Sequence, residues 1–296
     1  MSKLRRIAAG TAVVLCAAGI LTWLIAGPWI ERYREKNGLS EKATGMTVTF
    51  LDVGEGDCII VTADGETMMV DGGSPEYSDT VYSFLKKYSL DRLRYVFCTH
   101  PHSDHVGGLS GALNYAAADE AFCCVREYDS RSFEAFERYA GEQGLEITVP
   151  ECGTQLRLGE AVITVISPSR EYEDLNDCSL VLRIDYGSVR VLLTGDAGYD
   201  AENDMMKSDY SLRADLLKVG HHGSGSSSYY YFLKEVSPSY AVISVGRDNE
   251  HEHPSEYVIE KLEGLGAEVF RTDEDGTVVF KSDGSTIAPE NNKDNT

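Results

Sequence analysis

The sequence predicts a four-layer αββα sandwich of the α/β class, in which two β-sheets pack face to face and helices cover their outer surfaces. Short runs rich in β-branched residues alternate with amphipathic segments from Met46 to Lys281. These runs fall into two successive groups of strands with interspersed helices, one group before Pro150 and one after it. Two sheets that bury one face against each other and one against helices account for this order in a single domain.

The first group of elements occupies residues 46–150. Turn chemistry at Asp64-Gly65 separates two of its strands, and Val81, Phe84 and Leu85 give one helix an apolar face. The predicted strands are Met46–Val53, Cys58–Thr62, Thr67–Val70 and Arg94–Cys98, and the predicted helices are Tyr77–Tyr88, Gly107–Ala116 and Ser132–Glu142.

The second group follows Pro150 and is dominated by strands. A segment at Tyr186-Gly187-Ser188 predicts a hairpin turn between two of them. The predicted strands are Ala161–Ser167, Leu180–Tyr186, Val189–Thr194, Asp215–Val219, Tyr240–Val245, Glu268–Arg271 and Thr277–Lys281, and the predicted helices are Tyr229–Val236 and Ser255–Glu263.

The first 45 residues predict a membrane anchor in front of the domain. Residues 7–30 carry no charge and are long enough to cross a hydrocarbon core of about 30 Å as one transmembrane helix. Trp23 and Trp29 lie towards the far end, where an aromatic belt is expected. We therefore expect a single-pass cell-membrane protein with an extracytoplasmic domain; the alternative is secretion after cleavage of a signal peptide, whose apolar core is usually shorter. The expected parts are a basic N-terminus (1–6), the anchor (7–30), a linker (31–45), the domain (46–282) and a polar tail (283–296).

The composition indicates a folded globular protein with a strongly acidic balance. Hydrophobic residues make up 42% of the chain, and 48 acidic against 27 basic residues give a net charge of −21. Broad non-specific binding to nucleic acid depends on Lys and Arg that neutralise phosphates, so this balance opposes it. A small metal-lined pocket stays compatible, because bound metal ions supply their own positive charge.

The seven cysteines predict mostly buried, reduced thiols. Their spacing contains no Cys-x-x-Cys pair, which argues against a zinc ribbon and against a disulfide scaffold. A bridge from Cys152 to Cys123 or Cys124 stays open as an alternative outside the cytoplasm.

One histidine-rich segment carries the strongest chemical signal. His100, His102, Asp104 and His105 lie within six residues, directly after the apolar strand that ends at Cys98. Imidazole and carboxylate together suit zinc, iron or manganese. Alternate positions can direct His100 and His102 to one metal ion, while Asp104 and His105 turn towards a second. The alternative, a polar surface loop rich in histidine by chance, accounts poorly for three of only seven histidines in one segment.

The order His-x-His-x-Asp-His resembles the signature of the metallo-β-lactamase superfamily. Three further segments resemble that family in the same order along the chain: Met69–Gly73, Leu193–Asp196 and Leu217–Ser224. The resemblance implies that Asp71 supports the metal-binding loop and that Asp196 bridges both metal ions. It also implies that the third segment delivers the last histidine to the second ion, and His221 and His222 compete for that role, with His222 favoured.

A more specific likeness is to the subgroup related to the hydrolase domain of ComEC, a DNA-uptake channel protein. It covers residues from about Met46 to Phe280 and rests on Leu51–Asp57, Asn176–Leu182, Ala241–Gly246, His253-Pro254 and Arg271–Thr277. Many superfamily members place a further histidine where this chain has Asn176–Ser179. Asp177 is a candidate ligand there; the other interpretations are that Asn176 holds a water molecule or that the first metal site is weaker.

Three residues outside the ligand set are candidates for contact with the substrate. The first is His253, which could contact a phosphate or act as a general acid. His253, Asp71 and Asp104 are the catalytic candidates. Lys218 and Ser224 are candidates for binding an anionic substrate, although Lys218 could equally be a surface residue.

The resemblance implies a metal-dependent hydrolase that uses a metal-activated water. The expected cofactor is two zinc ions, with manganese as the alternative. The expected substrate is a small or polymeric phosphodiester, DNA included. The alternatives are another ester, a lactone or a thioester cleaved at the same centre, or a binding protein that retains the metal; the sequence leaves the oligomeric state open.

Overall fold

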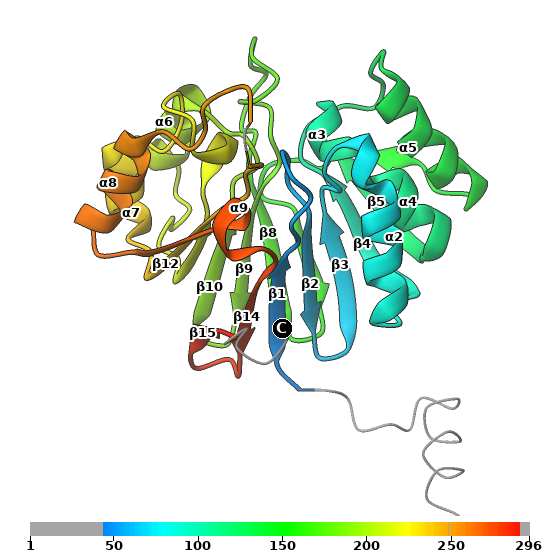
Figure 1. Ribbon diagram of the computed structural model, residues 1–296, viewed down its shortest axis with the longest axis horizontal. Helices are drawn as coiled ribbons and strands as arrows, with labels where there is room; N and C mark the ends of the chain where they lie inside the picture. Colours follow the sequence, from blue (N-terminus) through cyan, green and yellow to red (C-terminus); the bar gives the residue numbers. More distant parts are fainter. Residues whose placement is uncertain (1–43, 248, 291–296) are drawn as a thin grey trace, which may run out of the picture. The chain divides into compact units, whose positions relative to one another are not determined.

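The computed structural model describes residues 44–247 and 249–290, in which two β-sheets pack face to face between helices (Figure 1). The predicted anchor, nearly all of the linker and the end of the polar tail lie outside these residues. Within the described ranges, no helix combines the length and apolarity needed to cross a membrane.

The first sheet has eight strands in the order β15-β14-β1-β2-β3-β4-β5-β6. Its strands are antiparallel from β15 to β3 and parallel from β3 to β6. They span β1 (Met46–Phe50), β2 (Ile59–Ala63), β3 (Glu66–Val70), β4 (Arg92–Cys98), β5 (Ala117–Cys123), β6 (Ile147–Thr148), β14 (Val278–Ser282) and β15 (Ile287–Pro289).

The second sheet has seven strands in the order β13-β12-β11-β10-β9-β8-β7. Its strands are antiparallel from β7 to β10 and parallel from β10 to β13. They span β7 (Gln155–Leu158), β8 (Ala161–Ser167), β9 (Val181–Tyr186), β10 (Val189–Leu193), β11 (Leu216–Lys218), β12 (Tyr240–Ile243) and β13 (Glu268–Arg271).

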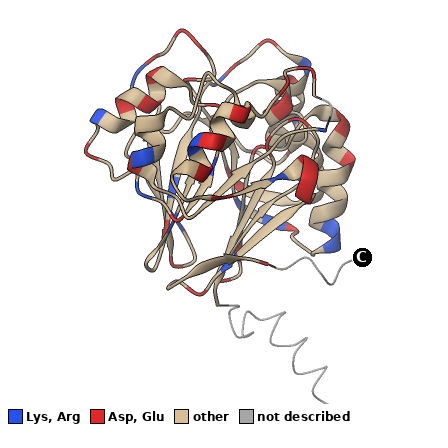
Figure 2. Ribbon diagram, turned by 60° about the vertical axis from the view of Figure 1, so that its left-hand side comes forward, with Lys and Arg blue, Asp and Glu red and all other residues tan. Residues whose placement is uncertain are grey.

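Helices cover the outer face of each sheet, which confirms the predicted αββα architecture. Those beside the first sheet are α2 (Ser78–Lys87), α4 (Leu109–Tyr115) and α5 (Arg131–Glu142), and those beside the second are α6 (Tyr199–Lys207), α7 (Tyr230–Val236) and α8 (Glu256–Gly264) (Figure 1). Most charged residues lie on these helices and on loops (Figure 2). The short elements are η1 (Pro75–Tyr77), α3 (Ser103–Val106), η2 (Gly220–Gly223) and α9 (Thr272–Asp275).

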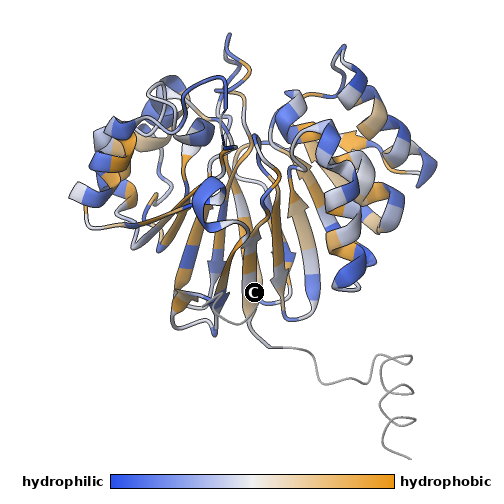
Figure 3. Cartoon of the chain, in the orientation of Figure 1, coloured by the Kyte–Doolittle hydropathy of each residue, from blue (hydrophilic) through white to orange (hydrophobic). Residues whose placement is uncertain are grey.

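Apolar strand residues contribute to three cores, one between the sheets and one under each helical layer (Figure 3). Phe97 of β4 packs in the central core, and its neighbour Val96 packs beneath the helices of the first sheet. In β10, Val191 packs centrally and Leu192 beneath the helices of the second sheet. Because successive side chains of a strand point to opposite faces, strands buried on both faces are apolar along their length.

The structure differs from the sequence predictions at several elements. The predicted polar tail begins with a turn, in which Asp283 accepts backbone N–H groups of Ser285 and Thr286, and continues as β15. The domain therefore extends beyond residue 282. Strands β5 and β7 and helix α6 were not predicted; Asp119 and Glu120 interrupt the apolar pattern of β5, which is buried only in its second half.

The cysteines of the described residues are all free thiols. The alternative bridge from Cys152 to Cys123 or Cys124 is therefore not formed. Cys123 lies at the end of β5 in the interior, whereas Cys152 lies in the loop before β7. The prediction of mostly buried, reduced thiols holds for Cys58, Cys98 and Cys123, and the others are half-buried.

One ion pair joins the two sheets in the interior. Lys218, the last residue of β11, and Asp57, in the loop between β1 and β2, are both fully buried, and Lys218 Nζ lies 2.8 Å from Asp57 Oδ2. The ammonium also donates a hydrogen bond to the Val219 carbonyl oxygen at 2.7 Å. This position contradicts the prediction that Lys218 binds an anionic substrate, because the ammonium is already paired and shielded from solvent.

Replacing Lys218 by methionine should destabilise the metal-free protein by about 3–5 kcal/mol, because the Asp57 carboxylate would stay buried without its partner. Urea denaturation in the presence of EDTA measures the free energy of unfolding. Lys207→Met is the matched control, since the Lys207 side chain is 67% exposed and its ion pair with Asp204 is long, at 3.8 Å. Equal stability of the Lys218→Met and Lys207→Met variants would contradict this account of the ion pair.

Candidate metal centre

The predicted ligands follow strands that end at the same edges of the two sheets. Asp71 follows β3 and His100 follows the parallel strand β4, so both lie at the carboxyl edge of the first sheet. Asp196 follows β10 and His222 follows the parallel strand β11 in the second sheet. Because parallel strands present their carboxyl ends together, residues far apart in the sequence meet there.

One carboxylate oxygen, Asp196 Oδ2, lies at the centre of the site. The Nε2 atoms of His105, His222, His100 and His221 lie 3.3, 3.5, 3.9 and 3.9 Å from it. Asp196 and three of these histidines are buried, and the His221 side chain is 26% exposed. Four imidazole nitrogens that converge on one carboxylate oxygen are a donor set suited to borderline transition-metal ions.

Asp104 completes a compact group of potential ligands. Its Oδ2 lies 3.3 Å from His222 Nε2 and 3.5 Å from His105 Nε2. Single ligand atoms from Asp104, His105, Asp196 and His222 all lie within 4.8 Å of one another. Within the described residues, His105 Nε2, His222 Nε2 and Asp196 Oδ1 are buried without a hydrogen-bond partner. Because such groups are costly to bury unsatisfied, these orphaned atoms fit a bound cation.

His100 and His102 form the other half of the cluster. His100 Nε2 lies 2.9 Å from His102 Nδ1, and His102 immediately precedes α3 in extended backbone conformation. His100 is fully buried, and its Nδ1 lies 3.1 Å from the Thr99 hydroxyl. The structure thus places the two predicted ligands of the first metal ion side by side, next to the Asp196 carboxylate.

Asp71 supports the site from behind. Its carboxylate accepts hydrogen bonds from the Thr99 backbone N–H and hydroxyl, both at 2.7 Å, and from His105 Nδ1 at 2.9 Å. A carboxylate bound to the outer nitrogen of a ligating histidine fixes the tautomer and orientation of the ring. Asp71, predicted among the catalytic residues, is fully buried and acts through His105.

A glycine-containing loop holds Asp104 in place. Gly56 has a φ of +113°, and a Cβ atom there would lie 2.0 Å from the Asp104 carbonyl oxygen. The next residue, Asp57, donates its backbone N–H to that oxygen at 3.2 Å. Only glycine permits this close approach in this backbone conformation, so residue 56 sets the position of the Asp104 segment.

The charges within the site shift the pKa values of its members in opposite directions. Burial alone lowers the pKa of His105 and His222, but the surrounding carboxylates, Asp196 foremost, raise that of His105 well above its ordinary value and that of His222 to about 10. Conversely, burial alone raises the pKa of Asp104 and Asp196. The imidazoles of His105 and His222 outweigh this effect and lower the pKa of each carboxylate below its ordinary value. In the metal-free protein, protons on His105 and His222 therefore supply positive charge to the carboxylates.

The candidate ligand Asp177 lies outside this cluster. Its Oδ1 accepts the backbone N–H groups of Gly198 and Ala201, at 2.9 and 3.1 Å, and so caps the start of α6. Ser179, two residues further on, is buried beside His100 instead, with its Oγ 3.4 Å from His100 Nδ1. Asp177 Oδ1 thus caps the start of α6, a contact that its sequence neighbours do not indicate.

The structure separates the two competing histidines. His222 is buried, and its Nδ1 donates to the Ser244 carbonyl oxygen at 2.9 Å, which directs Nε2 towards Asp104 and Asp196. His221 lies nearer the surface, with its Nδ1 3.1 Å from the Ser226 hydroxyl. His222 therefore lies in the compact group of potential ligands, to which His221 does not belong.

The remaining candidates line the outer side of the site. The His253 ring packs edge-on against the His221 ring, with 5.6 Å between the centroids. The Ser224 hydroxyl lies 3.0 Å from the Ser226 hydroxyl in the turn after His222. The contacts of Ser179, Ser226 and the Ser244 carbonyl with the histidines could not be predicted, because nothing in an isolated sequence shows which serine lies behind which histidine.

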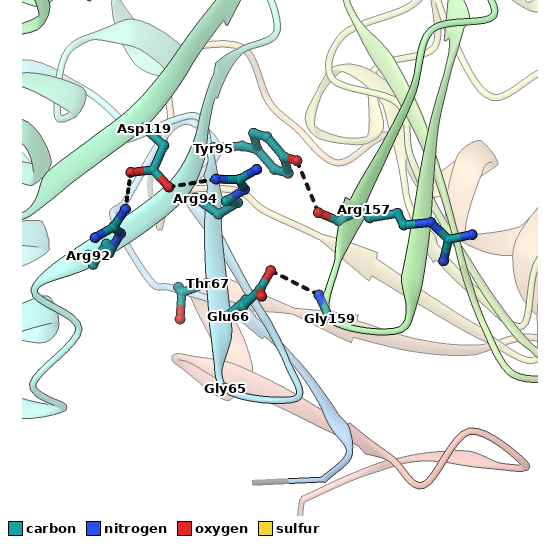
Figure 4. A pocket seen from close by; sticks show the side chains of 9 residues that line it. All are labelled: Gly65, Glu66, Thr67, Arg92, Arg94, Tyr95, Asp119, Arg157 and Gly159. Carbon is teal, nitrogen blue, oxygen red and sulfur yellow. Dashed lines mark hydrogen bonds and ion pairs between the residues drawn. The ribbon is translucent and has the colours of Figure 1, made fainter. Parts of the chain in front are cut away.

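A separate cavity of about 500 Å³ lies at the opposite end of β3 and β4, where these strands begin (Figure 4). Arg92, Arg94 and Arg157 line it, but Asp119 pairs with Arg92 at 2.8 Å and with Arg94 at 3.0 Å. The histidines follow the other end of β4. This cavity is therefore separate from the candidate metal centre.

Comparison with known sequences agrees with this geometry. The sequence model of the metallo-beta-lactamase superfamily matches residues 51–247. ComE operon protein 3 of Bacillus subtilis is 28% identical over 253 residues, which cover 79% of this chain and 33% of that protein. Competence protein ComA of Neisseria gonorrhoeae is 30% identical over 237 residues, covering 79% of this chain and 32% of that protein. The chain thus spans about a third of the length of these relatives.

Solved structures share the fold at low sequence identity. The metallo-beta-lactamase fold protein YhfI from Bacillus subtilis aligns with a TM-score of 0.55 at 16% identity, covering 80% of this chain and 100% of that one. CmlA, a diiron beta-hydroxylase from Streptomyces venezuelae, aligns with a TM-score of 0.52 at 14% identity. The alignment covers 77% of this chain and 53% of CmlA. At these identities the likeness shows the fold alone.

The metal-free protein should lose stability as the pH rises from about 6.5 to about 10. The pKa of His222 is raised from 6.5 to about 10 in the folded state. Its protonation therefore stabilises the fold fully below pH 6.5, and this stabilisation is lost as the pH rises through about 10. Denaturation in EDTA across this range measures the effect. The His222→Gln variant should show a smaller decline; a decline equal to that of the wild type would disprove the assignment to His222.

Proposed function

The chain belongs to the metallo-beta-lactamase superfamily, and we propose that it is a phosphodiesterase that works with a dinuclear metal centre. The observation that carries this proposal is the convergence of four imidazole Nε2 atoms on Asp196 Oδ2, with the Asp104 carboxylate beside them. One carboxylate within reach of two groups of histidines is the arrangement expected of a residue that bridges two ions.

The residues divide into two ligand groups around Asp196. His100 and His102 would hold the first ion, and Asp104, His105 and His222 the second. Nitrogen and oxygen donors of this kind suit zinc, and manganese is the alternative. When bound, such a pair of ions supplies Lewis-acid charge and makes a water molecule acidic enough to attack near neutral pH. Asp71 keeps His105 oriented, and Lys218 balances the charge of Asp57 behind the ligands.

A phosphodiester is favoured by the turn that follows the paired histidines. Residues 224–228 are four serines and a glycine, and the hydroxyls of Ser224 and Ser226 lie 3.0 Å apart beside His221. Hydroxyl groups and backbone amides at such a turn are suited to phosphate oxygens. Two of the matched relatives are named as a competence protein and a recombination protein, which is consistent with a phosphodiester substrate such as DNA.

We assign His253 to substrate contact rather than to proton donation. Burial and the nearby rings of His221 and His222 lower its pKa to about 4, so the imidazole is neutral at pH 7. A neutral ring can still donate one N–H to a phosphate oxygen, whereas a general acid must be protonated at the working pH. His253 Nδ1 is buried without a partner within the described residues, which leaves it available for such a contact.

A soluble fragment that starts at Met46 should hydrolyse bis-p-nitrophenyl phosphate when loaded with zinc or manganese, and should leave nitrocefin and a simple lactone intact. Single-stranded DNA in the same panel tests the polymeric substrate. Hydrolysis of only the lactone or only nitrocefin would show that the enzyme cleaves a bond other than a phosphodiester. Absence of turnover with every substrate, in protein that retains its metal, would favour a binding protein.

Asp196→Asn should lower turnover on the order of 10²-fold or more, because a neutral amide stabilises the metal charge poorly. Steady-state kinetics, with circular dichroism to verify folding, measures the effect. Asp209→Asn is the matched control on an exposed residue outside the site and should keep wild-type turnover. Unchanged turnover in the Asp196 variant would remove its bridging role.

We also propose that residues 7–30 hold the protein in the cell membrane, with the hydrolase domain outside the cytoplasm. The support is the uncharged apolar length of this segment and its flanking basic and tryptophan residues. The full chain should remain in the membrane pellet after carbonate extraction, whereas the fragment from Met46 should be released. A mature protein without residues 1–30 in the medium would instead show a cleaved signal peptide.

A further inference from the structure

The two ligand groups around Asp196 differ in how many protein side chains they contain. The group around Asp104 has four members, Asp104, His105, Asp196 and His222. For the other ion, the ligands predicted from the sequence that the described residues place together are His100 and His102, with His100 beside Asp196. The neighbouring Asp177 is occupied at the start of α6, and Ser179 is buried behind His100. The segment Asn176–Ser179, where many superfamily members have a histidine, therefore leaves the first ion without a third histidine.

The backbone at His221 and His222 is held in a rare conformation. Their φ and ψ values are 48° and 51° for His221, and 51° and 26° for His222, so two successive residues with side chains adopt the left-handed region. Such a conformation is unfavourable for residues other than glycine and concentrates at functional sites. Here it lets both rings approach Asp196 Oδ2, with Nε2 distances of 3.9 and 3.5 Å.

The second observation is the way in which each ring is anchored. His105 Nδ1 is bound by Asp71, His222 Nδ1 by the Ser244 carbonyl oxygen and His100 Nδ1 by the Thr99 hydroxyl, and each Nε2 lies near Asp196 Oδ2. His221 follows the same pattern, because its Nδ1 contacts Ser226 Oγ at 3.1 Å. Metal-binding histidines are characteristically held by a contact to the nitrogen that faces away from the ion.

We propose that His221 is the third histidine ligand of the first metal ion. One turn, Gly220–Gly223, then gives a ligand to each ion, His221 to the first and His222 to the second. His221 Nε2 lies as far from Asp196 Oδ2 as His100 Nε2 does, 3.9 Å, and His221 does not belong to the compact group around Asp104, so it is free to serve the other ion. This inference rests on the proposed dinuclear centre. It takes the ligand from the turn after β11, whereas the sequence indicated Asp177, before β9.

Metal content tests the proposal independently of catalysis. The full chain is loaded with zinc, dialysed against a buffer with a fixed free-zinc concentration and analysed by mass spectrometry for zinc per chain. Wild type should hold two ions. His221→Ala should hold one ion, and its affinity for the other ion should fall at least about 100-fold. This decrease in affinity is larger than that typical of a residue that only supports a ligand. His251→Ala is the matched control, since His251 is exposed and two residues from His253, and it should keep both ions.

A double variant identifies which ion is lost. If His221 and His102 hold the same ion, the His102→Ala/His221→Ala variant should retain one ion, like each single variant. The His221→Ala/His222→Ala variant should lose both. Manganese-loaded protein gives an independent spectroscopic readout, because exchange coupling between two ions should disappear from its electron paramagnetic resonance spectrum in His221→Ala.

The anchor of the ring gives a weaker variant that keeps the imidazole. Ser226→Ala removes the contact to Nδ1 and should reduce the affinity of the first ion by about 10-fold, without loss of the second. His221→Ala that holds two ions with wild-type affinity would overturn the proposal. If the wild-type protein holds a single ion, both the proposal for His221 and the proposed dinuclear centre are overturned. Two bound ions without phosphodiester hydrolysis would refute only the proposed reaction.

Discussion

The Asp196 carboxylate imposes the constraint on which the rest of the site depends. It is buried, it is surrounded by imidazoles, and it lies close to a second carboxylate, Asp104. Moving an ionised carboxylate out of water costs several kcal/mol unless positive charge or strong hydrogen-bond donors replace the water. In the metal-free protein, protons on His105 and His222 meet this need, as the raised pKa of both rings shows. A metal ion meets it better, because it brings more charge and frees both imidazoles to act as neutral ligands.

The fold makes this concentration of charge possible by joining two sheets at their carboxyl edges. Each sheet brings its own ligands at the ends of parallel strands, and the ion pair between Lys218 and Asp57 joins the sheets behind them. The apolar cores along the strands provide the stability that a polar centre of this kind cannot provide itself.

Much of this arrangement could be predicted from the sequence, and the failures have definable physical causes. Apolar periodicity indicated most strands, and the His-x-His-x-Asp-His spacing indicated the ligand segment, because both signals are local. Asp177 and Lys218 show the limit of this approach. Whether a carboxylate ligates an ion or caps a helix, and whether an ammonium faces solvent or a buried aspartate, depends on neighbours 21 and 161 residues away in the chain. The unpredicted strand β15 has the same cause, since its three residues gain their stability from pairing with β14.

The acidity of the chain is compatible with an anionic substrate once local and global charge are separated. The net charge of −21 arises largely from residues on helices and loops, where water and salt screen their effect over about 10 Å. At the site, Asp104 and Asp196 are the carboxylates of the compact ligand group, and two divalent ions would bring twice the charge that these two carry. The centre would therefore be locally positive in a protein that is negative elsewhere. Such a distribution favours a phosphodiester that can reach the ions individually, while the surrounding surface repels the extended backbone of a long polyanion. For the proposed phosphodiesterase, this charge pattern would select substrates by size without a basic groove.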